Sequence, residues 1–122
     1  MASIFQPSIQ TFKAGGTIVK GHVVKLSTDD GQTVIEATAA TDKSCGIAQC
    51  DAVSGGLVEV ALSGGGAKAK AHTTIAIGDF LASYTDGTLN PTTSANDVIL
   101  GQAMQAAVVG DIFAMHVIVS LL

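Results

Sequence analysis

The sequence predicts an all-β protein: a small β-barrel or sandwich built from two similar β units, with an extended N-terminal arm. Three observations lead to this prediction. Apolar and polar residues alternate over short runs, and glycine-containing turns separate these runs. Much of the sequence also occurs as two similar copies. We expect an arm at residues 1–16 and a single β domain at 17–122, with units at about 17–62 and 74–122 and a linker at 63–73.

Length and composition set the limits of the core. A chain of 122 residues favours one domain. Hydrophobic residues make up 48% of the chain but aromatic residues only 4%, and 14 residues are glycine. Small side chains bury little apolar area each, so one subunit has a thin core. This composition favours an oligomer.

The arm carries large apolar side chains in a segment outside the repeated part. Ile4, Phe5, Ile9 and Phe12 lie in its first thirteen residues, and Pro7 favours an extended backbone. Exposed apolar residues near a terminus need a surface that covers them. We expect the arm to pack either on its own subunit, on a sister subunit or on a different protein.

Each unit then begins with a glycine-led apolar strand and an Asp-Gly turn. The segment GHVVKLSTDDG (21–31) matches GDFLASYTDG (78–87) with one residue deleted. An Asp-Gly pair between apolar runs is a strong hairpin signal. Return strands are predicted in QTVIEAT (32–38) and TLNPTT (88–93), where Pro91 marks an edge strand or a strand end.

The second part of each unit is a short strand, a turn and a long strand. Residues 45–62, CGIAQCDAVSGGLVEVAL, match residues 100–117, LGQAMQAAVVGDIFAMHV. Because side chains alternate along a strand, the core faces of the two copies coincide. The matched core-facing sets are Val58, Val60 and Leu62 with Phe113, Met115 and Val117. On the opposite face, Glu59 and Ala61 match Ala114 and His116.

The last strand, residues 112–122, is apolar on both faces. A strand with one face in water normally alternates, so both faces of this one are predicted to be covered. We expect a second subunit to supply the outer cover. The predicted oligomer interface consists of Ile118, Val119, Leu121 and Leu122.

No pattern of catalytic, metal-binding or cofactor-binding residues stands out. Cys45 and Cys50 are five residues apart, which places them on opposite faces of a strand, and we expect buried free thiols. His22, His72 and His116 lie far apart in sequence without metal-ligand spacing. We therefore predict a protein that is not an enzyme and that holds no cofactor and no metal.

Charge excludes further classes of function. The formal net charge is −4 and all six cationic residues are lysine, so a nucleic-acid partner is not expected. No apolar run reaches the length of a membrane span, and the first residues lack the pattern of a signal peptide. A soluble protein made in a cytoplasm, without a membrane partner, is the expectation.

The chain resembles the small capsid decoration, or cement, proteins of tailed bacteriophages. The similar segments are TIVKGHVVKLSTDDG, CGIAQCDAVSGG, TIAIGDFLASYTDG and LGQAMQAAVVGD, which lie within residues 17–122. His22 departs from the acidic residue that usually follows the first glycine. The resemblance implies a non-enzymatic virion protein on the outer capsid surface that stabilises the head, often as a homotrimer.

On this resemblance the expected partner is the major capsid protein. Ile4, Phe5, Pro7, Ile9 and Phe12 are the predicted capsid-binding arm. Two alternatives stay open: another virion component, such as a head-fibre base or a tail-associated β domain, and a biotinyl or lipoyl carrier domain. Carrier domains modify a lysine next to a methionine, and here Ala103 and Gln105 flank Met104, which argues against the carrier.

Overall fold

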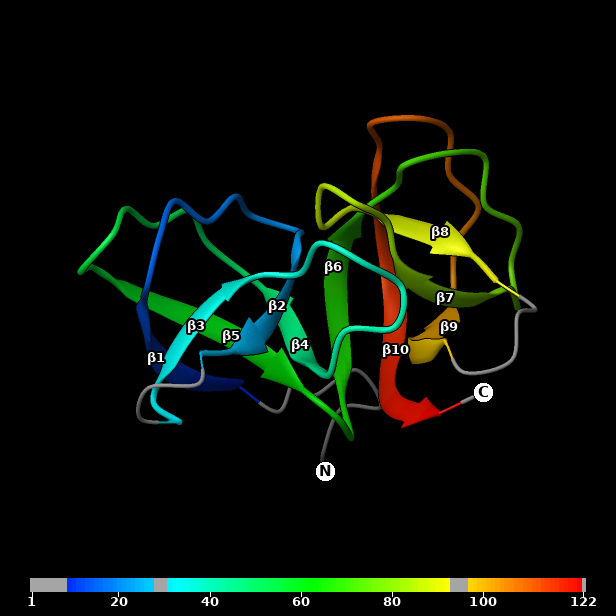
Figure 1. Cartoon of the computed structure of the whole chain (residues 1–122). Helices are drawn as coiled ribbons and strands as arrows, with labels where there is room; N and C mark the ends of the chain where they lie inside the picture. The colour runs from blue at the N-terminus through cyan, green and yellow to red at the C-terminus, as the bar shows by residue number, and fades with distance from the viewer. Residues whose placement is uncertain (1–8, 28–30, 93–96, 122) are drawn as a thin grey trace, which may run out of the picture.

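The computed structural model describes residues 9–27, 31–92 and 97–121, and every regular element in them is a β-strand (Figure 1). The all-β prediction is therefore confirmed. The strands are β1 (Ile9–Ala14), β2 (Val23–Leu26), β3 (Thr33–Glu36), β4 (Ser44–Ala48), β5 (Leu57–Leu62), β6 (Gly66–Lys70), β7 (Phe80–Ser83), β8 (Leu89–Pro91), β9 (Val98–Ala103) and β10 (Ile112–Leu121).

The first five strands close into a barrel with the order β1-β3-β2-β4-β5. The strand pairs are antiparallel except for β1 and β3, which run parallel and join Lys13 to Thr33 and Ala14 to Val34. Closure removes the free edges that an open sheet would expose.

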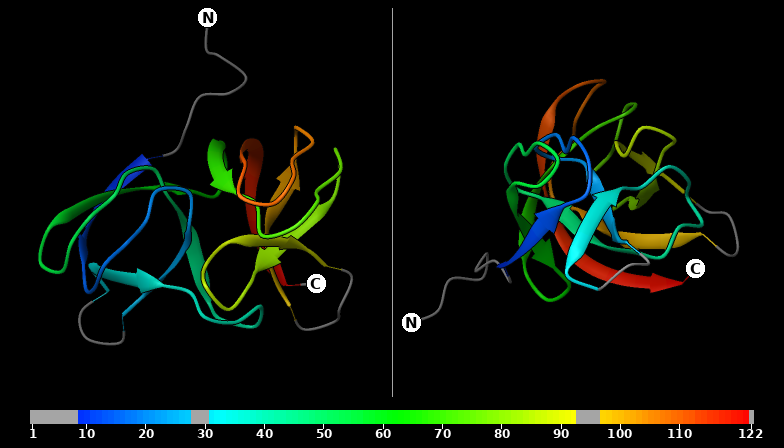
Figure 2. Two further views of the ribbon diagram at one scale, coloured as in Figure 1. Left: turned by 90° about the horizontal axis from the view of Figure 1, so that it is seen from above. Right: turned by 60° about the vertical axis from the view of Figure 1, so that its left-hand side comes forward.

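The last five strands form a sheet with the order β6-β10-β9-β7-β8, which lies beside the barrel (Figures 1 and 2). Its two outer strands approach each other only through a parallel bridge between Ala71, just after β6, and Leu89 of β8. The Asp-Gly turn predicted at 86–87 lies between β7 and β8. There the Gly87 N–H donates to the Tyr84 carbonyl oxygen at 3.1 Å, and the glycine has a φ of +84°.

One hydrophobic cluster fills the barrel, and a second, larger one joins the two halves. The barrel cluster includes Phe12, Val34 and Val58. The shared cluster combines Val23 and Ile47, on the outside of the barrel, with the core of the second sheet. The open sheet is thus completed by the outer face of the barrel, and the two halves have a common core.

The core faces predicted for the two long strands agree with the structure. Of the residues predicted to face the core, Val58, Val60, Phe113, Met115 and Val117 are buried and Leu62 is partly buried against the barrel cluster. Glu59 and His116, on the opposite face, are exposed. Ala61 differs from the predicted pattern, because it is fully buried although it shares its face with Glu59. It packs in the cluster between the halves, where β2, β4 and β5 are covered on both sides.

Two segments are strands where the sequence predicted an arm and a linker. Residues 9–14 of the predicted arm (1–16) form β1, which pairs with β5 on one edge and with β3 on the other. Residues 66–70 of the predicted linker (63–73) form β6, which pairs with β10 from Gly66 to Lys70. Each half thereby gains a first strand that lies outside the matched sequence segments.

Candidate functional site

The predicted capsid-binding arm is divided between described and undescribed residues. Ile4, Phe5 and Pro7 lie outside the described residues. Ile9 begins β1 opposite Ala61 and remains 39% exposed. Phe12 points into the barrel and is only 9% exposed, so its side chain anchors β1 in the core. Within the described part of the arm, Ile9 is the apolar side chain that can contact a partner.

The predicted oligomer interface lies at the end of β10. Ile118 is 47% exposed, and Val119, on the other face, is partly buried against the shared core. The side chain of Leu121 is not described, and Leu122 lies outside the described residues. Within this subunit the outer face of β10 is therefore uncovered, which leaves Ile118 accessible to a second copy.

Sequence reasoning missed exposed apolar residues at two separate places, in the loop before β5 and at the start of that strand, and likewise at β10. Val53 and Leu57 are 71% and 72% exposed, and Val108 and Ile112 are 58% and 47% exposed. These residues occupy matched positions in the two sequence copies. The match between residues 45–62 and 100–117 contains this signal, because both copies carry large apolar residues at these positions. The structure places these four in water.

Aspartate side chains fix these loops by accepting backbone hydrogen bonds. Asp51 accepts from the Lys20 N–H at 2.7 Å, and Asp111 accepts from the Val108 N–H at 3.1 Å. In the neighbouring loop of the second half, Asp79 accepts from the Ala76 N–H at 2.9 Å. Such side-chain to backbone bonds hold turns in one conformation, so the apolar loop ends are presented on a defined backbone.

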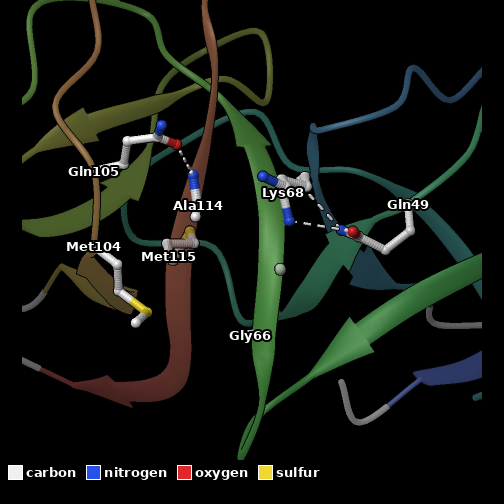
Figure 3. Close-up of a pocket in the computed structure, with 8 residues that line it drawn as sticks. Gln49, Gly66, Lys68, Met104, Gln105, Ala114 and Met115 are labelled. Carbon is white, nitrogen blue, oxygen red and sulfur yellow. Dashed lines mark hydrogen bonds between the residues drawn. The ribbon is translucent and has the colours of Figure 1, made fainter. Parts of the chain in front are cut away.

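A groove of about 570 Å³ runs across β6 and β10 where the halves meet (Figure 3). Gln49, from the barrel, forms one wall, and Met104 and Gln105 form the other. Gly66 and Ala114 contribute to the floor, and Lys68 is the charged side chain among the lining residues. The groove is open and largely apolar, and it brings no acid–base pair or nucleophile together.

Glutamine side chains complete the backbone hydrogen bonding around this groove (Figure 3). The Gln49 amide accepts from the Lys68 N–H at 3.2 Å and donates to the Lys68 carbonyl oxygen at 3.1 Å. Gln105 accepts from the Ala114 N–H at 3.0 Å. The Gln105 amide thus satisfies a backbone N–H of β10. The Gln49 amide bonds to the backbone of β6 and so links the barrel to that strand.

The two cysteines are free and half-buried. Burial raises the pKa of the Cys45 thiol to about 11, so it stays protonated at neutral pH and is a poor nucleophile. The Cys50 sulfur accepts a hydrogen bond from the Glu59 N–H at 3.4 Å.

The histidines occupy three separate environments. His22 is 8% exposed, and its Nδ1 lies 2.9 Å from the Glu36 carboxylate. This contact is an ion pair only when His22 is protonated, and Nδ1 has no hydrogen-bond partner among the described residues. The His72 ring stacks on Tyr84, and His116 is exposed on β10. Among the described residues, no three His, Cys, Asp or Glu side chains are grouped as metal ligands.

In the described part of the chain, no helix is long and apolar enough to cross a membrane.

Comparisons with known proteins give a family and a fold. A family model described as phage cement protein matches residues 5–119. The crystal structure of the head fibre gp8.5 N base in bacteriophage phi29 has a TM-score of 0.74 to this chain, with 23% sequence identity. The match covers 96% of this chain and 98% of that chain. No curated protein matches the chain.

Proposed function

The chain belongs to the phage cement protein family, and from this premise we propose that it binds the outer surface of a phage head and stabilises the shell by binding alone. Membership in this family makes the protein a structural component of the bacteriophage virion, located on the capsid. A structural virion family also implies a protein that is not an enzyme. The proposed partner is the major capsid protein.

One observation carries the proposal: the family match extends over residues 5–119 and therefore over both halves. The structure supports a role in binding. The exposed apolar side chains described above lie on β-strands and hydrogen-bonded loops, so a partner can cover them at little cost in conformational entropy. Rigid apolar surface of this kind is typical of a protein-binding module.

We assign the capsid contact to the arm, through Ile4, Phe5, Pro7 and Ile9. Phe12 supports this contact indirectly, because its burial in the barrel fixes β1, the strand that begins at Ile9 and follows the other three residues in the chain. An extended apolar segment that begins at a sheet strand can add main-chain pairing to an edge of its partner.

The proposed assembly is a homotrimer. Its interface is assigned to Ile118, Val119, Leu121 and Leu122, because β10 is uncovered on its outer face within one subunit. Three-fold symmetry suits the local three-fold positions of a capsid lattice. Light scattering at micromolar concentration measures the mass directly, and Ile118→Asp is expected to convert trimers into monomers.

The test of the function uses purified protein and undecorated phage heads. The full chain should bind until the lattice is saturated and should raise the temperature at which the heads open. Deleting residues 2–8 should leave the melting temperature of the free protein almost unchanged and should weaken head binding. If heads never saturate, the function is wrong; if the truncated protein binds heads normally, only the arm assignment is wrong.

A head-fibre base is the second candidate, because the head fibre gp8.5 N base of phi29 has a similar fold. At 23% identity this likeness shows the fold alone. Labelling of the protein on virions distinguishes the two, since cement covers the shell lattice evenly whereas a fibre base marks only the fibre attachment points.

A further inference from the structure

A second groove lies between the halves, apart from the groove of Figure 3. It has a volume of about 450 Å³. Ala39 and Ala40 of the barrel form one side, and Tyr84, Asn90 and Asp97 lie on the other. The Val98 N–H donates to the Ala40 carbonyl oxygen at 2.8 Å and holds the two sides together. Junctions between structural units are frequent positions for ligand sites.

Tyr84 supplies a rigid aromatic surface in this groove. It is the sole tyrosine of the sequence and is 40% exposed. The His72 ring stacks on it with centroids 3.6 Å apart and an interplanar angle of 15°. The Tyr84 backbone N–H also donates to the Thr88 carbonyl oxygen at 2.7 Å. A fixed aromatic ring with a polar tip suits a ligand that is partly apolar and partly hydroxylated.

Polar groups beside the tyrosine are available for a ligand. The side chains of Thr85 and Asn90 have no hydrogen-bond partner among the described residues. The Thr92 hydroxyl donates to one oxygen of Asp97, and the second carboxylate oxygen has no hydrogen-bond partner among the described residues. The groove therefore offers amide donors and acceptors, a hydroxyl and a carboxylate within one concave surface.

The charge of the groove narrows the class of ligand. Asp97 is the charged side chain among its lining residues, and no lysine lines it. Phosphate and carboxylate ligands need cations or a cluster of N–H donors, so they are disfavoured here. The carboxylate and the amide instead match the closely spaced hydroxyl groups of a sugar ring, whose C–H face can lie on an aromatic ring.

We propose that this groove binds an uncharged saccharide. Its volume is in the range of small-molecule sites and is large enough for one or two sugar rings. The site is independent of the proposed capsid contact, because it uses neither the arm nor the outer face of β10. A virion protein with this groove would bind carbohydrate as well as the shell.

Tyr84 itself provides the measurement. The chain contains one tyrosine and no tryptophan, so its intrinsic fluorescence reports on this groove. The full chain is titrated with glucose, galactose, mannose, N-acetylglucosamine, maltose and cellobiose, and with glucuronate as a charged probe. At least one neutral sugar should give a saturable change of Tyr84 emission, and glucuronate should bind more weakly than glucose. No saturable change with any neutral sugar, or tighter binding of glucuronate, overturns the proposal.

Variants place the binding in the groove. Asn90→Ala and Asp97→Asn should each weaken sugar binding about three- to tenfold, the loss expected for one hydrogen bond. Thr17→Ala, at an exposed polar position outside the groove, is the control and should leave the affinity unchanged. Thermal melting of all three shows whether they are folded. Equal affinities in folded wild type, Asn90→Ala and Asp97→Asn would contradict the assignment.

Discussion

The first half of the chain closes into a barrel, whereas the second half, with the same pairing scheme, remains a sheet. In each half the first strand pairs with the fifth, the fifth with the fourth, the fourth with the second, and the second with the third. The halves differ in the last contact. β1 and β3 share two paired positions, but the second half has the bridge from Ala71 to Leu89 in their place.

The difference teaches that the halves are not independent. The barrel has its own interior, including Phe12 and Val58, whereas the second sheet shares its core with Val23 and Ile47 from the barrel exterior. A sheet that is completed by a neighbouring surface has less need to close on itself. Equal pairing is what an internal duplication would produce, and the duplication itself remains a prediction from the sequence.

The comparison also explains why matched positions hold different reactive side chains. Cys50 and Gln105 are matched in sequence, as are Glu59 and Ala114. In the first half the Cys50 sulfur accepts from the Glu59 N–H, and in the second half Gln105 accepts from the Ala114 N–H. Both halves place a hydrogen-bond acceptor at this position, a weak one in the Cys50 thiol and a stronger one in the Gln105 amide oxygen.

The largest effect is expected where matched glycines allow strands to approach closely. A Cβ on Gly46 would lie 2.2 Å from the Ala61 carbonyl oxygen, and one on Gly101 would lie 1.8 Å from that of His116. Gly46→Ala and Gly101→Ala should each cost more than about 4 kcal/mol and yield insoluble protein. Gly16→Ala, with no atom within 4 Å of the added Cβ, is the control. Soluble, stable variants at 46 and 101 would refute the close approach.

The next effect tests the shared core. Phe113 is 1% exposed, and Phe113→Ala should lower the free energy of unfolding by about 3–5 kcal/mol, measured in urea. Because the shared cluster joins the halves, both should unfold in one transition. Glu59→Ala and His116→Ala, on exposed positions, should change stability by less than about 0.5 kcal/mol. Two separate transitions would mean that the halves are independent.

A smaller effect is expected at the matched acceptors. Gln105→Ala removes the partner of the Ala114 N–H and should cost about 1 kcal/mol. Cys50→Ser keeps an acceptor for the Glu59 N–H and should stay within about 0.5 kcal/mol of the wild type. Thermal melting compares the two variants. An equal loss in both would indicate that side-chain size, and not the acceptor, determines stability at this position.

The smallest effect is expected in the dependence of stability on acidic pH. Burial tends to raise the pKa of Asp42, but hydrogen bonds from the Thr38 N–H and from Lys25 outweigh it, so the pKa lies below its ordinary value. In the second half, burial of Asp86 is likewise outweighed by hydrogen bonds from Thr88, with a further contribution from His72, and its pKa is also lowered.

A carboxyl group with a lowered folded-state pKa stabilises the protein above the unfolded pKa, which is about 4, and loses this contribution as the pH falls through the folded value. Stability should therefore decline below about pH 4. Asp42→Asn and Asp86→Asn should each make the urea midpoint less dependent on pH between neutral and acidic buffers. An unchanged slope in both variants would contradict the assigned hydrogen bonds.

Much of the local structure could be predicted from the sequence. Period-two alternation identified the buried faces that contain Val58 and Phe113, and the Asp-Gly pair located the turn at Gly87. Both signals act over a few residues, because strand geometry and turn conformation depend on near neighbours.

Other features depended on contacts between segments far apart in the chain. Residues 9–14 have a composition that predicted part of an arm, and residues 66–70 one that predicted part of a linker. Both segments are strands because they pair with β5 and β10. Ala61 is buried because the second sheet covers the barrel. Local sequence thus determined the alternating strands such as β5 and β10, the Asp-Gly turn and the class of fold. Tertiary structure alone decided which apolar residues form the shared core and which, like Leu57, remain exposed. Burial of a strand residue depends on the segment that packs against its face of the strand.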